Sequence, residues 1–134
     1  MRNILLSCIL SLALPFQVMA QSLDAGVVVG NESALSIAIV PMPYQGASSA
    51  PEFDVATIIR NNLNRSGQFR SLEAASITEK PTQGSDVRYP VWKALKQDFV
   101  VVGRGVDATD GNYSIEYELI DVAKQQNLLS LKMP

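Results

Sequence analysis

Two acidic side chains on one predicted strand are the residues best suited to catalysis in this sequence. Glu116 and Glu118 alternate along the segment from 113 to 120, so strand geometry places them on one face, about 7 Å apart. They would imitate the carboxylate pair of a glycosidase, in which the general acid needs an apolar pocket to raise its pKa. A solvent-exposed sheet face explains the pair as well. A small hydrolase or carbohydrate-binding domain is therefore kept as the alternative interpretation.

A second group of oxygen-bearing side chains follows the preceding strand. Asp107, Asp110 and Asn112 carry ligands of the type that calcium prefers. Their spacing departs from that of an EF-hand loop, and turns favour Asp and Asn for conformational reasons. We therefore predict a turn without a bound metal.

A pair of glycines could be mistaken for a nucleotide-binding loop. Gly103-Arg104-Gly105 follows a predicted strand, as a dinucleotide fingerprint would. The fingerprint needs a third glycine that opens a helix, whereas a hairpin follows here. We expect a β-bulge at these glycines and no nucleotide cofactor.

Two further motifs have plain structural interpretations. Trp92 lies on an amphipathic segment and is expected in the core, with an anchor at the rim of an interface as the alternative. Asn31-Glu32-Ser33 fits an N-glycosylation acceptor, but three-residue matches arise readily by chance. Neither motif predicts an active site.

The composition removes several classes of site. The chain has no His, and its one Cys, Cys8, lies within the first twenty residues. Once that segment is removed, disulfides, Cys/His zinc sites, cysteine nucleophiles and Ser-His-Asp triads have no residues to build them. Eleven basic and thirteen acidic residues, without a long run of either sign, argue against a nucleic-acid-binding surface. We predict a protein that is not an enzyme and that needs no cofactor.

Residues 1–20 have the organisation of a signal peptide. A basic residue precedes an apolar run from Ile4 to Leu14, and Val18-Met19-Ala20 has the small residues of a cleavage site before Gln21. The apolar run is about half as long as a membrane-spanning helix. A buried N-terminal helix and lipidation at Cys8 are the alternatives. The signal peptide predicts export from the cytoplasm.

Residues 21–33 are interpreted as a flexible N-terminal arm. Its central run, Gly26-Val27-Val28-Val29-Gly30, is rich in β-branched residues, bounded by glycines and too short to anchor a core. An ordinary edge strand is the other interpretation of this run.

From residue 34 to 134 the hydrophobic pattern predicts one α/β domain. The predicted strands are 35–40, 68–72, 99–106, 113–120 and 129–133, and the predicted helices begin at Pro51 and Pro90. Gly67 is expected to end the first helix, and residues 73–86 are expected to form a loop. The fold class is a mixed β-sheet with two helices packed on one face and a C-terminal antiparallel meander.

Four segments, in order, resemble the TolB family of the Tol-Pal system. They match its first core strand, its first helix and turn, its tryptophan helix with the central strand, and its hairpin strand. The matching segments are Ser36–Met42, Ile58–Phe69, Trp92–Gly103 and Tyr113–Asp121. No single motif is decisive, but together they cover most of residues 36–131.

The resemblance implies a function in the cell envelope. Members of this family are periplasmic adaptors of Gram-negative bacteria. They link TolA of the inner membrane to Pal of the outer membrane and so maintain the outer membrane and its invagination during division. The family's N-terminal arm binds TolA and its β-propeller binds Pal. Carried over by position, the TolA-binding residues are Ser22, Leu23, Asp24, Ala25, Gly26, Val27, Val28 and Val29.

The sequence departs from the family pattern at Pro134, where it stops. The resemblance implies a further helix that closes the domain, followed by the propeller. We therefore expect a domain that is incomplete at its C-terminus, and that is marginally stable or dependent on a partner.

Overall fold

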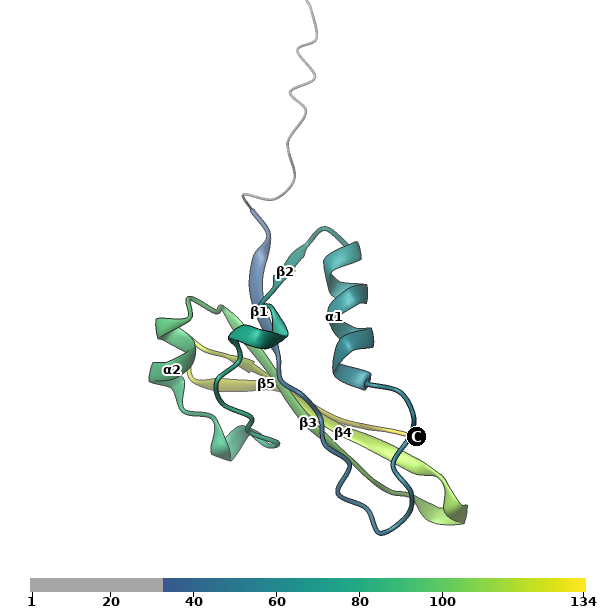
Figure 1. Cartoon of the computed structure of the whole chain (residues 1–134). Helices are drawn as coiled ribbons and strands as arrows, with labels where there is room; N and C mark the ends of the chain where they lie inside the picture. The colour runs from purple at the N-terminus through teal and green to yellow at the C-terminus, as the bar shows by residue number, and fades with distance from the viewer. Residues whose placement is uncertain (1–32) are drawn as a thin grey trace, which may run out of the picture.

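Five strands form one mixed sheet in the order β2-β1-β3-β4-β5 (Figure 1). The structure is a computed structural model and describes residues 33–134. The strands are β1 (Leu35–Ile39), β2 (Phe69–Ser71), β3 (Phe99–Asp107), β4 (Tyr113–Asp121) and β5 (Gln126–Met133). The helices of this part of the chain are α1 (Val55–Arg65) and α2 (Tyr89–Ala94), with short 3-10 turns at Ala74–Ser76, Gly84–Asp86 and Thr109–Gly111.

The strand pairing confirms the predicted fold class. β1 pairs in parallel with both β2 and β3, while β3, β4 and β5 form an antiparallel meander. The apolar run at the start of β3 lies in the middle of the sheet, as a strand covered on both faces should. The residue pattern therefore gave the strands, their approximate bounds and the mixed character of the sheet.

One detail of the predicted architecture is wrong, because the two helices lie on opposite faces of the sheet (Figure 1). Ala56 of α1 packs with Ile37 and Ile39 of β1. Trp92 of α2 instead packs with Ala38, the residue between them, which points to the other face.

The topology explains this arrangement. The chain moves from β1 to β2 in one direction along the sheet, and then from β2 across β1 to β3 in the other. Crossovers between parallel strands are right-handed, so reversing the direction of movement places the second crossover on the opposite face. The strand order, which the residue pattern did not provide, therefore decides the layer of α2.

The start of α1 also differs from the prediction. The helix begins at Val55 rather than in a first turn at Pro51. Asp54 is the N-cap: its Oδ1 accepts a hydrogen bond from Ala56 N at 3.1 Å, and its Oδ2 accepts one from the Thr57 hydroxyl at 2.5 Å. These bonds lower the pKa of Asp54, with the Thr57 hydroxyl as the largest cause. A capping side chain therefore fixes the helix start.

Gly67 ends the first helix as predicted. Its φ of 72° lies in the left-handed region that glycine adopts without strain. The chain then reverses into β2, whose Phe69 packs against the α1 side of the sheet.

Candidate functional site

The predicted TolA-binding residues lie outside the part of the chain that the structure describes. Ser22, Leu23, Asp24, Ala25, Gly26, Val27, Val28 and Val29 all precede Ser33, the first described residue. Asn31 and Glu32 of the possible glycosylation motif lie outside it as well. The structure therefore describes the domain from β1 onward but not the proposed binding residues.

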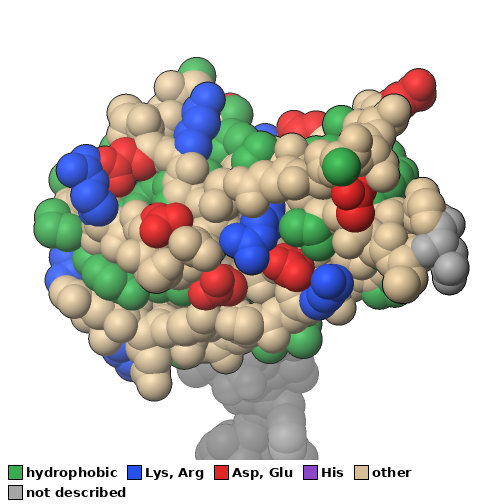
Figure 2. Space-filling view, turned by 90° about the horizontal axis from the view of Figure 1, so that it is seen from below, with side chains coloured by type: hydrophobic (Ala, Val, Ile, Leu, Met, Phe, Trp, Pro, Cys, Tyr) green, Lys and Arg blue, Asp and Glu red, His purple; other side chains and the backbone are tan. Residues whose placement is uncertain are grey.

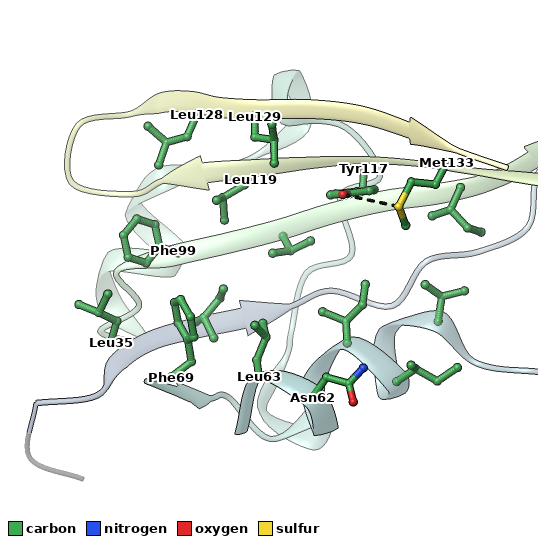
Figure 3. Close-up of a pocket in the computed structure, with 16 residues that line it drawn as sticks. Leu35, Asn62, Leu63, Phe69, Phe99, Tyr117, Leu119, Leu128, Leu129 and Met133 are labelled. Carbon is green, nitrogen blue, oxygen red and sulfur yellow. Dashed lines mark hydrogen bonds between the residues drawn. The ribbon is translucent and has the colours of Figure 1, made fainter. Parts of the chain in front are cut away.

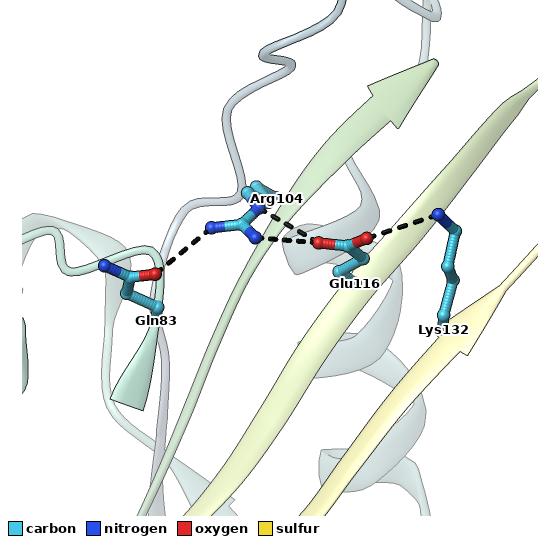
Figure 4. Close-up of polar contacts among 4 residues, drawn as sticks. All are labelled: Gln83, Arg104, Glu116 and Lys132. Carbon is cyan, nitrogen blue, oxygen red and sulfur yellow. Dashed lines mark hydrogen bonds and ion pairs between the residues drawn. The ribbon is translucent and has the colours of Figure 1, made fainter. Parts of the chain in front are cut away.

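The two carboxylates Glu116 and Glu118 share the face of the sheet that carries α2, but they are not arranged as a catalytic pair. Glu116 lies between two cations on neighbouring strands (Figure 4). Arg104 Nη2 is 2.8 Å from Glu116 Oε2, and Lys132 Nζ is 3.3 Å from Glu116 Oε1. Arg104 Nη1 also donates to Gln83 Oε1 at 3.4 Å.

The two neighbouring cations make Glu116 unsuitable as a general acid. Its pKa is lowered, chiefly by the hydrogen bond from Arg104 and next by that from Lys132. A general acid at neutral pH needs a raised pKa. Glu118 accepts a hydrogen bond from Asn127 Nδ2 at 2.6 Å, so it too serves cross-strand pairing. The geometry does not favour the hydrolase alternative.

Asp107 holds a loop in place. Its carboxylate accepts hydrogen bonds from the Tyr44 hydroxyl, from Ala47 N at 2.6 Å and from Ser48 N at 3.3 Å. These donors, with Tyr44 as the largest cause, lower the Asp107 pKa to about 2. Asp110 lies in the 3-10 turn Thr109–Gly111. Among residues 33–134, no group of three or more acidic, His or Cys side chains could hold a metal ion.

We expect Asp107 to make the order of this loop depend on pH. The folded-state pKa of about 2 lies below the ordinary value of 3.8, so the carboxylate stabilises the fold above about pH 4. This contribution is lost as the pH falls from about 4 to about 2. The protection factors of the Ala47 and Ser48 amides against hydrogen exchange, which correct for the intrinsic pH dependence of exchange, should fall across that window. In Asp107→Asn the exchange should be faster from the outset, without that pH step. An unchanged step in the variant would contradict this role.

The two glycines of β3 allow a close backbone approach and do not form a bulge. The β3–β4 register runs without interruption from Phe99 to Asp107, so the predicted bulge is wrong. Residues 43–45 instead lie beside Gly105, whose N–H donates to Pro43 O at 2.9 Å and whose carbonyl accepts from Gln45 N at 2.7 Å. A Cβ at Gly105 would lie 2.9 Å from Tyr44 Cδ2. The glycines are therefore needed for packing.

The same loop fills the place where open α/β sheets usually bind ligands. That place is the crevice at the carboxyl ends of the strands, where the strand order reverses. Here the reversal lies between β1 and β3, and residues 43–45 run along β3 just beyond β1. The chain itself occupies the position that a nucleotide would need.

Sequence reasoning missed an apolar groove of about 620 Å³ on the α1 face (Figure 3). Residues of all five strands line it, and α1 forms one wall. Of its sixteen lining residues only Asn62 and Tyr117 carry polar side-chain atoms. The other fourteen are Leu35, Ile37, Val55, Ile58, Ile59, Leu63, Phe69, Phe99, Val101, Ile115, Leu119, Leu128, Leu129 and Met133.

The sequence did hold a signal for this groove. Ile115 and Leu119 alternate on one face of β4, and Leu129 and Met133 continue that face on β5. The prediction placed both helices on one face of the sheet without saying which, so it did not indicate that this face would be left half open. With α2 on the other face, α1 alone covers β1 and β2, and the β4–β5 half is left open.

The charged side chains do not form a patch of one sign on the surface seen from below. Basic and acidic side chains are interspersed there, with hydrophobic side chains between them (Figure 2). Neither helix among residues 33–134 is long and apolar enough to cross a membrane.

Comparison with curated proteins identifies close relatives. A Tol-Pal system protein TolB of Xanthomonas euvesicatoria is 48% identical over 130 residues, and one of Xanthomonas campestris is 49% identical over the same length. Each alignment covers 96% of this chain but only 30% of the relative. The chain therefore spans less than a third of the length of these relatives.

Two solved structures share the fold of this chain. The crystal structure of TolB from Acinetobacter baumannii superposes with a TM-score of 0.56 at 26% identity, over 75% of this chain and 23% of that one. The C-terminal domain of LpoB from Salmonella enterica shares the fold, with a TM-score of 0.58 at 12% identity, over 75% of this chain and 80% of that one. The sequence profile of the TolB amino-terminal domain matches residues 23–128. The chain therefore belongs to the family of TolB amino-terminal domains.

Proposed function

We propose that this chain is the N-terminal, partner-binding part of a periplasmic adaptor of the Tol-Pal system. The observation that supports this most directly is the 48% identity to a Tol-Pal system protein TolB across 96% of the chain. The proposal assigns a binding function, with residues 1–20 acting as a signal peptide and the mature protein located in the periplasm. It assigns no catalytic residue.

The proposed TolA-binding element is the arm Ser22–Val29. A segment with alternating side chains can add as a strand to the open edge of a partner's sheet, where main-chain hydrogen bonds give affinity and every second side chain gives selectivity. Leu23, Ala25, Val27 and Val29 would form the contacting side.

The pairing of β1 would hold the C-terminal end of the arm in a fixed position. The arm is followed directly by β1, which pairs with a strand on each side, and Ile39 is fully buried. Leu35 N also donates to Gln68 O at 3.0 Å, at the very start of the strand. A partner that binds the arm would therefore be tethered to an interior strand of the sheet.

Pal binding belongs to another part of the adaptor in this proposal. The relatives extend well beyond the length of this chain, and the family resemblance implies that a propeller in that further part would bind Pal. The linkage between the two membranes, and with it envelope maintenance during division, is therefore proposed for the whole adaptor. This chain contributes the TolA-binding end.

Removing the arm tests the proposal. We expect deletion of residues 22–29 to abolish binding to the C-terminal domain of TolA, measured by isothermal titration calorimetry, while the circular dichroism spectrum stays unchanged. Strand addition further predicts that Val27→Asp weakens binding at least tenfold, about 1.4 kcal/mol. Val28→Asp is the matched control on the opposite side and should weaken binding much less. Unchanged affinity after the deletion would refute the proposal.

A further inference from the structure

We propose that the end of the domain at which the arm joins β1 is a basic surface, and that it attracts a partner protein with acidic side chains beside its arm-binding edge. Five cations form this surface: Arg65, Arg70, Lys93, Lys96 and Lys124. The inference rests on the proposed function, because it adds the charge of the partner to binding by the arm.

The strand register brings these cations to one end of the sheet. Leu35, the first residue of β1, lies opposite Phe69 of β2. Ile37 lies opposite Phe99, the first residue of β3, and Phe99 lies opposite Asp121, the last residue of β4. The cations flank these positions: Arg65 ends α1, Arg70 is the second residue of β2, Lys93 lies in the last turn of α2, Lys96 precedes β3, and Lys124 lies between β4 and β5.

Two surface pockets place three of the cations around the start of β1. One pocket, of about 570 Å³, is lined by Leu35 together with Lys93 and Lys96. The other, of about 430 Å³, is lined by Ser36 together with Arg70 and Lys96. All five cations of the basic surface are exposed. A partner that approaches the arm from this end would therefore meet their charges.

The carboxylates of the same end do not cancel this charge. They are Glu73, Asp98 and Asp121, against five cations. Asp98 Oδ2 accepts a hydrogen bond from Ser36 N at 2.8 Å, and Asp121 Oδ1 accepts one from Lys124 N at 2.9 Å. Asp121 Oδ2 is also 3.8 Å from Lys124 Nζ, and among residues 33–134 this is the one ion pair that the five cations make. The basic surface therefore keeps a net positive charge.

The opposite end of the sheet has no such surplus of cations. Glu52 and Asp54 precede α1 there, and Asp107 ends β3. Seen from below, basic and acidic side chains are interspersed (Figure 2). An uneven charge distribution of this kind orients an approaching charged molecule as well as attracting it. An acidic partner would therefore be directed to the end where the arm joins the sheet.

The length of the chain keeps a partner on the arm close to this surface. Six peptide units separate Val29, the last proposed binding residue, from Leu35. Even fully extended, they span at most about 22 Å. Charges are screened over about 8 Å at physiological ionic strength, so the side of the partner that faces the domain lies within range of the cations. Acidic side chains on that side would raise the association rate more than they slow dissociation.

Association kinetics with the C-terminal domain of TolA test the proposal. We expect Lys93→Glu and Lys96→Glu each to slow association about threefold at low ionic strength, with little change in the dissociation rate. Lys132→Glu is the matched control, because it changes the net charge equally but lies opposite Glu116, five residues along β4 from Asp121 and so about 17 Å away. It should slow association much less. At about 0.5 M salt the difference should disappear. Equal slowing by Lys132→Glu, or faster association of the two test variants, would overturn the inference.

A second measurement separates this inference from the proposed function. Poly-L-glutamate, added to the whole exported chain, should shift the amide resonances of Arg70, Lys93 and Lys96 and leave those of Lys80 and Lys132 in place. Shifts spread evenly over all the cations would overturn the inference. If the shifts gather at the basic surface while the wild-type chain does not bind the TolA domain, the inference of an acidic partner is supported and the proposed function is refuted.

Discussion

Trp92→Ala should lower the free energy of unfolding by about 3–5 kcal/mol, the largest loss expected for a single truncation in this domain. Trp92 is fully buried and belongs to a core cluster with residues of β1, β3 and β4, among them Ala38, Val102 and Ile120. Because α2 has only six residues, it has few other side chains with which to hold its place on the sheet. Urea denaturation followed by circular dichroism measures the loss.

Trp92→Phe separates the packing of the ring from its polar atom. Trp92 Nε1 is buried and has no hydrogen-bond partner among the described residues. Replacing the indole by a phenyl ring removes this unsatisfied donor, which offsets part of the lost volume. We expect a much smaller loss of stability than for alanine. Equal losses in both variants would show that the ring does not determine the packing of α2.

Gly103→Ala should lower the free energy of unfolding by about 1–3 kcal/mol through overpacking. A Cβ at this position would lie 2.6 Å from the backbone oxygen of Glu116, 3.0 Å from Met42 Sδ and 3.0 Å from Tyr117 Cβ. The first of these atoms belongs to the paired backbone of β4, so it moves only if the strands separate. The same denaturation experiment measures the effect.

Gly84→Ala is the control for this argument. Its Cβ would also meet an atom at very short range, Glu118 Oε2. That atom is the far end of a flexible side chain, which can rotate away. We expect a loss well below that of Gly103→Ala. If the two substitutions cost the same, a rigid strand contact is not the reason for glycine at position 103.

The site shows where residue patterns stop being informative. The alternation of Glu116 and Glu118 placed both carboxylates on one face, and they do lie there. Their partners come from β3 and β5: Arg104 and Lys132 at Glu116, and Asn127 at Glu118. Gln83, in the loop before α2, accepts a hydrogen bond from Arg104. Only the register of β4 with its neighbours decides that Glu116 is paired and has a lowered pKa.

The groove, too, depends on something that residue patterns do not predict, namely which face of the sheet each helix covers. The sequence predicted the apolar faces of β4 and β5 and both helices, yet it placed the two helices on one face, whereas they lie on opposite faces. The layer of α2 follows from the order β2-β1-β3 and the right-handedness of crossovers. Strand order depends on contacts between segments far apart in the chain, and no local periodicity encodes it.

The amino-acid sequence by itself determined the family, the α/β class, the positions of the strands and the end of α1 at Gly67. It could do so because periodicity, turn chemistry and glycine's access to positive φ are local properties of the chain. Tertiary structure alone decided three things: which face each helix covers, the use of Gly103 and Gly105 for close approach, and the open groove. Each of these depends on which distant segments become neighbours, and that is settled when the sheet assembles.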